Sequence, residues 1–294
     1  MSMNIKLSPT SMLTTTATLT PRKSVLRATA RQVDNHTILT ERYHDAPLKI
    51  TKTFYEEATG RLQLYIMDVS PGLLDGDSYE LNLQLEDNTH LIVTNQSFTK
   101  IHPTPYQSAE LIQNLHLGKG AVLEYMPEPT IPYAGSRFQG RIKVDLEEAA
   151  TLLYADIVTP GRTHRGELFQ YDSYSSRFEV YRQQQLLAWD QFLLEPAIHD
   201  YNGIGAMEDY THNGTFWIVT DQVSQALLDR IRLLLPASDV DESILAGASF
   251  TASGHSIVVR MLGHNVWQLQ ELVKLIWDEC RSSLLDMPPC QLRK

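Results

Sequence analysis

Short stretches in which apolar and polar side chains alternate dominate the chain from about Thr20 to Trp217. In Leu81–Leu85 and Arg141–Leu146 every second side chain is apolar, which is typical of a β-strand with one buried face. The same pattern predicts strands at Thr37–Tyr43, Leu48–Tyr55, Arg61–Met67, His90–Asn95, Ala109–Leu117, Ala121–Tyr125, Leu152–Val158, Leu168–Tyr174, Phe178–Tyr181 and Leu186–Leu194. We therefore expect a mainly β fold of stacked, largely antiparallel sheets.

The apolar spacing becomes helical after Thr220, at Val223, Leu227, Ile231 and Leu234. We expect this helix to begin at Thr220-Asp221, because both side chains can cap a first turn. A second helix is predicted from near Asn265 to a point before Pro288-Pro289. Two short strands, around Leu245–Thr251 and Ser256–Met261, lie between the helices.

The predicted organisation is one extended domain, because no long linker rich in Pro, Gly or Ser divides the chain. It comprises a flexible N-terminus at residues 1–19 and a single domain at residues 20–294. Within that domain, residues 20–219 form the β body and residues 220–287 form an α+β cap with two C-terminal helices. A chain of 294 residues with 43% hydrophobic content can bury a large core.

Composition narrows the functional classes. The formal net charge is −10 and no cluster of basic residues occurs, which argues against nucleic acid as a partner. No apolar run is long enough to cross a membrane, and Met1–Thr20 lacks the features of a signal peptide. We therefore expect a soluble, cytoplasmic protein. The two cysteines are too few for a disulfide framework; Cys280 is expected to pack in the core and Cys290 to lie near a fraying end.

Two aspartates interrupt apolar strands: Asp156 within Leu152–Val158, and Asp190 within Leu186–Leu194. An ionised carboxylate buried there without a partner is strongly disfavoured. One interpretation is that each aspartate faces solvent or pairs with an arginine. The other is a hydrated acidic passage through the sheets, where oxygen ligands bind a divalent cation weakly enough for it to move on. The pattern alone leaves both open.

Enzyme signatures are absent from the sequence: it has no phosphate-binding glycine loop, no His-Glu-x-x-His and no nucleophile elbow. One alternative function is a β-rich hydrolase in which Asp156 and Glu167 serve as base and acid. Another is a static binding module in which the acidic residues only neutralise arginines such as Arg162 or Arg260. Two loops add polar groups, the acidic turn Pro71–Asp77 and the segment Thr94–Lys100.

A series of motifs ordered along residues 20–285 resembles the urease accessory protein UreD family, called UreH in some lineages. No single motif is specific, but their order and spacing are. They are Ala46–Ile50 with Phe54-Tyr55, Gly72–Asp77, Thr94–Gln96 with Thr99-Lys100, Leu123–Pro129 with Ile131-Pro132, Gly161-Arg162 ahead of Gly166-Glu167, Glu179-Val180, Leu186-Leu187, Ala246–Ser249 and Val259-Arg260. Ser78 and Gln183-Gln184 depart from the family pattern, where many relatives have an arginine and a glycine-containing turn.

The resemblance implies a cytoplasmic chaperone or scaffold without catalysis of its own. Such proteins bind apo-urease and, through the helical partner UreF, recruit the GTPase UreG that brings nickel, so a 2:2 complex with UreF is expected. No cofactor is expected to bind tightly, and nickel(II) would only be in transit through an internal tunnel. The resemblance assigns the tunnel lining to Asp77, Thr99, Asp156 and Asp190, and Glu167 is a further acidic candidate.

Overall fold

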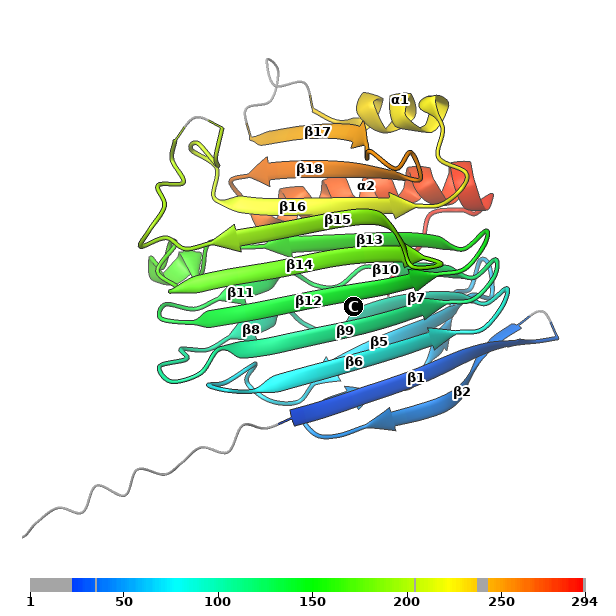
Figure 1. Ribbon diagram of the computed structural model, residues 1–294, viewed down its shortest axis with the longest axis horizontal. Helices are drawn as coiled ribbons and strands as arrows, with labels where there is room; N and C mark the ends of the chain where they lie inside the picture. The colour runs from blue at the N-terminus through cyan, green and yellow to red at the C-terminus, as the bar shows by residue number, and fades with distance from the viewer. Residues whose placement is uncertain (1–22, 35, 204, 237–242, 293–294) are drawn as a thin grey trace, which may run out of the picture.

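The protein is seen in a computed structural model that describes residues 23–34, 36–203, 205–236 and 243–292. The predicted flexible N-terminus, residues 1–19, lies outside the described residues. Two β-sheets face one another, and two helices pack on the far side of the second sheet (Figure 1). The predicted mainly β fold with stacked sheets is therefore confirmed.

The first sheet, sheet A, has seven strands, and no helix or strand of the described residues covers its outer face (Figure 1). Its order is β15 (Gln185–Leu194), β14 (Ser173–Arg182), β12 (Arg137–Leu146), β9 (Ala109–Leu117), β6 (Ser78–Leu85), β1 (Lys23–Val33) and β2 (His36–His44).

The second sheet, sheet B, has eleven strands. Its main path is β17 (Ile244–Phe250), β18 (Ser256–Gly263), β16 (His212–Val219), β13 (Thr151–Val158), β10 (Val122–Tyr125), β7 (His90–Asn95), β5 (Leu62–Asp68) and β3 (Leu48–Ile50). Three short strands join it at the side: β4 (Phe54–Tyr55), β8 (Thr99–Ile101) and β11 (Thr130–Pro132).

The pairing direction corrects the prediction of largely antiparallel sheets. The central neighbours in both sheets run parallel: β9 pairs with β6 and β12 in sheet A, and β10 pairs with β7 and β13 in sheet B. The reason is that consecutive strands cross from one sheet to the other, so the neighbour within a sheet comes from the next crossing and points the same way. Antiparallel pairs occur towards the ends of the sheets, for example β14 with β15 and β16 with β18.

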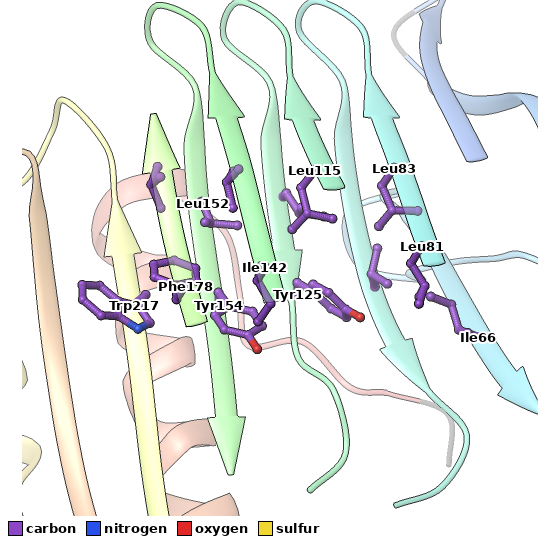
Figure 2. Close-up of a cluster of buried hydrophobic side chains, with 14 of the residues drawn as sticks. Ile66, Leu81, Leu83, Leu115, Tyr125, Ile142, Leu152, Tyr154, Phe178 and Trp217 are labelled. Atoms are coloured by element: carbon purple, nitrogen blue, oxygen red, sulfur yellow. The ribbon is translucent and has the colours of Figure 1, made fainter. Parts of the chain in front are cut away.

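Strand alternation divides the side chains between two cores. The main core fills the space between the sheets, and Figure 2 shows part of it as a row from Trp217 through Tyr154 and Tyr125 to Ile66. The second core lies between sheet B and the helices. On β13, Tyr154 and Val158 belong to the main core, whereas Leu153 and Ala155 belong to the second.

The helices are α1 (Gln225–Leu234) and α2 (Val266–Leu285). The predicted start of α1 at Thr220-Asp221 was wrong: the Ser224 side chain accepts a hydrogen bond from the Leu227 backbone N–H. Asp221 pairs with Arg182 instead. Between the helices, β17 and β18 extend sheet B. No helix in the described part of the chain is long and apolar enough to span a membrane.

Two further errors concern strand bounds. The predicted strand Leu168–Tyr174 is mostly loop, because a 3-10 turn at Thr163–Arg165 precedes it and β14 begins only at Ser173. Phe169 also adopts a positive φ, which a continuous strand excludes. The predicted strand Leu48–Tyr55 divides into β3 and β4.

Candidate functional site

Two cavities lie between the sheets and share a wall. The larger measures about 100 Å³ and the smaller about 20 Å³. Since one water needs about 10–15 Å³, the larger has room for several waters and the smaller for about one. The residues that line both are Ile142, Tyr154, Asp156 and Ser176.

Asp156 stands at the junction of the two cavities. It lies on β13 between Tyr154 and Val158 in the alternation, so its carboxylate points between the sheets. It forms no side-chain hydrogen bond or ion pair with any described residue. Burial, and secondarily the negative charge of Asp190, raises its pKa to about 7. The carboxyl group is therefore poised between its neutral and charged forms near neutral pH.

Asp190 lines the smaller cavity from the opposite sheet. It lies on the edge strand β15, and its Oδ1 atom is 2.7 Å from Nη2 of Arg260 on β18. Nη1 of Arg260 also donates to Thr215 Oγ1 at 3.3 Å. Thr215 is the register partner of both Asp156 and Arg260. An ion pair that joins the two sheets therefore lies at the wall of the smaller cavity.

A third carboxylate, Asp68 at the end of β5, lines the larger cavity. Its Oδ1 accepts hydrogen bonds from the Ser70 backbone N–H at 2.8 Å and the Ser70 hydroxyl at 2.6 Å. The Tyr79 hydroxyl donates to Oδ2 at 3.3 Å, and burial raises the pKa of Tyr79. Sequence reasoning missed Asp68; the available signal was a carboxylate that directly follows the apolar segment Arg61–Met67.

Thr99, in the polar segment Thr94–Lys100, lies on the wall of the larger cavity. Its hydroxyl accepts a hydrogen bond from Asn95 Nδ2 at 3.4 Å, and Asn95 Oδ1 in turn accepts from the Glu128 backbone N–H at 2.6 Å. Asn95, Thr99 and Glu128 all line this cavity. The structure therefore places Thr99, Asp156 and Asp190 in the walls of two adjacent cavities, which together are called the path below.

Asp77 and Glu167 are not among the residues that line either cavity. Asp77 Oδ2 accepts a hydrogen bond from the Leu74 backbone N–H at 2.9 Å and so closes the acidic turn. Glu167 accepts from Arg162 Nε at 2.7 Å, and this arginine lowers the pKa of Glu167. The guanidinium of Arg162 lies 4.1 Å from the Tyr133 ring centroid, so the pair fixes the surrounding loops.

A separate buried cluster ties α2 to sheet B. Arg281, which is 0% exposed, bonds Glu124 at 2.7 Å through Nη1 and Glu56 at 2.8 Å through Nη2. Trp277 donates to Glu124, and His90 Nε2 lies 2.5 Å from Glu124 Oε1. Burial acts to raise the pKa of Glu124, but the contacts with His90 and Arg281 outweigh it, so this pKa is lowered. Every charge in this cluster has a partner.

Groups of three or more His, Cys, Asp or Glu side chains that could hold a metal ion do not occur among the described residues. The polar groups of the path come from different strands instead, as with Asp68 on β5, Thr99 on β8, Asp156 on β13 and Asp190 on β15. They are carboxylate, hydroxyl and amide oxygens, the ligands that hold divalent cations with modest affinity.

The fold and the cavities define a class: a sandwich of two mixed sheets with two adjacent cavities between them, both lined in part by acidic side chains. The sequence model described as UreD urease accessory protein matches residues 22–294, and the chain belongs to this family. It is similar to the urease accessory protein UreD of Bacillus sp. (strain TB-90), with 36% identity over 89% of this chain and 94% of that one. The UreD proteins of Acetivibrio thermocellus (32% identity; 87% and 96% covered) and Staphylococcus aureus strain RF122 (29%; 88% and 93%) are also similar.

Proposed function

We propose that this protein acts in urease maturation as a scaffold and that nickel(II), as its cargo, passes between the two sheets towards apo-urease. Family membership supports the role in urease maturation. The observation that carries the transit step is Asp156, a carboxylate without a protein partner that faces both cavities. A divalent cation would supply the compensating charge that the described residues do not.

The chemistry of the path fits transit. Asp68, Thr99, Asp156 and Asp190 offer oxygen ligands one after another, on both sides of the shared wall. Oxygen donors exchange nickel more readily than the imidazole and thiolate ligands of tight sites. Room for several waters allows the ion to keep part of its hydration shell. A cation can therefore move by exchanging water for carboxylate oxygen in steps.

The partners belong to the same proposal. We infer that apo-urease and UreF bind this chain in the cytoplasm, that UreG joins through UreF, and that two copies bind a UreF dimer. The similarity to UreD proteins supports this assembly. Co-purification of the tagged chain with UreF, with and without UreG, tests the order of binding. Capture of UreG without UreF contradicts it.

The alternatives differ in their support. Two observations argue against the hydrolase. Asp156 and Glu167 do not line a common cavity, and the Glu167 carboxylate is hydrogen-bonded to Arg162. The static binding module is favoured by one specific observation, the ion pair between Asp190 and Arg260. If that module were the whole function, removing the carboxylates would alter stability without blocking nickel transfer.

The test is reconstituted urease activation with the double variant Asp156→Asn/Asp190→Asn. Assembly of the partner complex is checked by size-exclusion chromatography, and the nickel content of urease is measured. We expect normal assembly with nickel content reduced at least tenfold. Asp145→Asn is the matched control, because Asp145 is a strand aspartate on the outer face of sheet A, 3.3 Å from Lys143. Wild-type nickel content in the double variant refutes the transit step.

The variant Asp77→Asn distinguishes two predictions: the family resemblance assigns Asp77 to the tunnel lining, whereas the geometry does not. The geometry predicts nickel transfer at the wild-type level once the complex has assembled, because Asp77 lies off the path. Loss of transfer in an intact complex would place Asp77 on the route of the ion.

A further inference from the structure

Arg260 occupies a particular position at the Asp190 end of the passage. It contacts two wall residues of the smaller cavity, Asp190 and Thr215. The Arg260 side chain is 44% exposed, whereas that of Asp190 is 19% exposed. The guanidinium therefore lies on the solvent side of the residues that close the path.

We propose that Arg260 is the gate of this end: its guanidinium masks Asp190, and a divalent cation passes only when the guanidinium has moved away. This inference rests on the proposed role of the passage in cation transit. A cation that binds Asp190 competes with the Arg260 guanidinium for the same carboxylate oxygens. Their like charges also repel one another at contact distance in a partly buried site.

The contacts of Arg260 allow such a movement. Its guanidinium has three neighbours: Asp190 in the ion pair, the Thr215 hydroxyl in a hydrogen bond, and the Trp217 ring, whose centroid is 5.8 Å away. Being nearly half exposed, it can rotate into water, which replaces its lost hydrogen bonds. Arg281 is the counter-example: it is fully buried and bound to Glu124, Glu56 and the Pro288 carbonyl, so moving it would leave buried charges unpaired.

The gate also sets the charge of the passage. With Arg260 in place, Asp190 is neutralised, and among the described residues Asp156 is the one carboxylate of the smaller cavity without an ion-pair partner. With Arg260 turned outward, two carboxylates face the cavity from opposite sheets. The cation and the outward position of Arg260 therefore favour one another, and the closed position favours release.

Isothermal titration of the full-length protein with Ni²⁺ tests the gate. We expect Arg260→Gln to bind Ni²⁺ at least about tenfold more tightly than wild type, since the competing charge is gone. Arg260→Gln/Asp190→Asn should lose this gain. Arg31→Gln is the matched control, because it breaks the ion pair of Arg31 with Glu86, remote from the cavities, and should leave the affinity unchanged.

Equal Ni²⁺ affinity in Arg260→Gln and wild type overturns the gate. Thermal melting by circular dichroism establishes that each variant is folded. If Arg260→Gln does not fold, Arg260→Met removes the charge while keeping an unbranched apolar stem beside Trp217, and equal affinity there has the same meaning. Arg260→Lys retains the charge and should bind Ni²⁺ within about threefold of wild type; a tenfold gain in it would also contradict the charge argument.

The gate and the transit step fail in different ways. If Asp156→Asn/Asp190→Asn leaves the nickel content of urease unchanged, the transit step is refuted whatever Arg260 does. If that variant blocks nickel transfer but Arg260→Gln alters neither Ni²⁺ affinity nor the rate of transfer, only the gate is refuted.

Discussion

Replacement of Asp156 by asparagine tests the environment of the passage without any partner protein. The asparagine keeps the size of the side chain and removes its charge. In the folded protein the pKa of Asp156 is about 7, against 3.8 for an unperturbed aspartate. Between these values the folded state binds a proton that the unfolded state has released. The unfolding free energy contributed by this group is therefore full below about pH 4 and is lost as the pH rises to about 7.

The magnitude follows from the same two values. The difference between 3.8 and about 7 corresponds to about 4 kcal/mol over the whole range. Between pH 5 and pH 8, about 3 kcal/mol of this should be lost. Water that enters the cavity would screen part of the penalty, so this is an upper value. Asp156→Asn has no group to ionise there, and we expect its stability relative to wild type to rise by up to that amount.

Urea denaturation followed by circular dichroism at pH 5 and pH 8 measures the effect. The control is again Asp145→Asn, because the Asp145 side chain is 49% exposed and its replacement should alter stability by less than about 0.5 kcal/mol at both values. If wild type and Asp156→Asn change in parallel between pH 5 and pH 8, Asp156 is hydrated like a surface carboxylate. The reasoning on its burial is then refuted.

Two further predictions concern the scaffold around the passage. Arg281→Met should reduce the unfolding free energy by about 3–5 kcal/mol, because it leaves Glu124 and Glu56 buried without their cation; a loss below 1 kcal/mol in urea denaturation would contradict this. Gly72→Ala should lower the melting temperature, because Gly72 has a φ of 135° and an added Cβ would collide with the Lys100 carbonyl; an unchanged melting temperature in calorimetry would contradict it.

The sequence predicted the strands better than their pairing. Alternation with a period of two residues indicates which side chains of a strand are buried. It does not indicate which other strand pairs with it in the sheet. Here many turns, such as those after β6, β9 and β12, lead into the opposite sheet, so residues far apart in sequence become neighbours. Asn114 donates to Asn82 at 2.9 Å across 32 positions of the chain. Nothing in a local hydrophobic pattern distinguishes that connection from a hairpin within one sheet.

The candidate site was predictable where the signal was local. Asp156 and Asp190 each break an apolar run, and both prove to line the smaller cavity. The pairing of Asp190 with Arg260 was not predictable from the local pattern, because Arg260 lies on the other sheet. Cys290 shows the converse error: it was expected near a fraying end, yet it is fully buried, with Gln63 Nε2 3.6 Å from its sulfur.

Glu124 is fully buried and Asp156 is half-buried in the same sheet, and the contrast between these two acids bears on function. Glu124 is neutralised by Arg281, accepts a hydrogen bond from Trp277, and has a lowered pKa. Asp156 forms no such contacts among the described residues, and its pKa is raised. A fold that provides a cation for one carboxylate and not for the other carries an unfavourable charge at one point. A passing divalent cation would relieve that charge, and a residue that only stabilised the sheets would have no reason to remain unpaired.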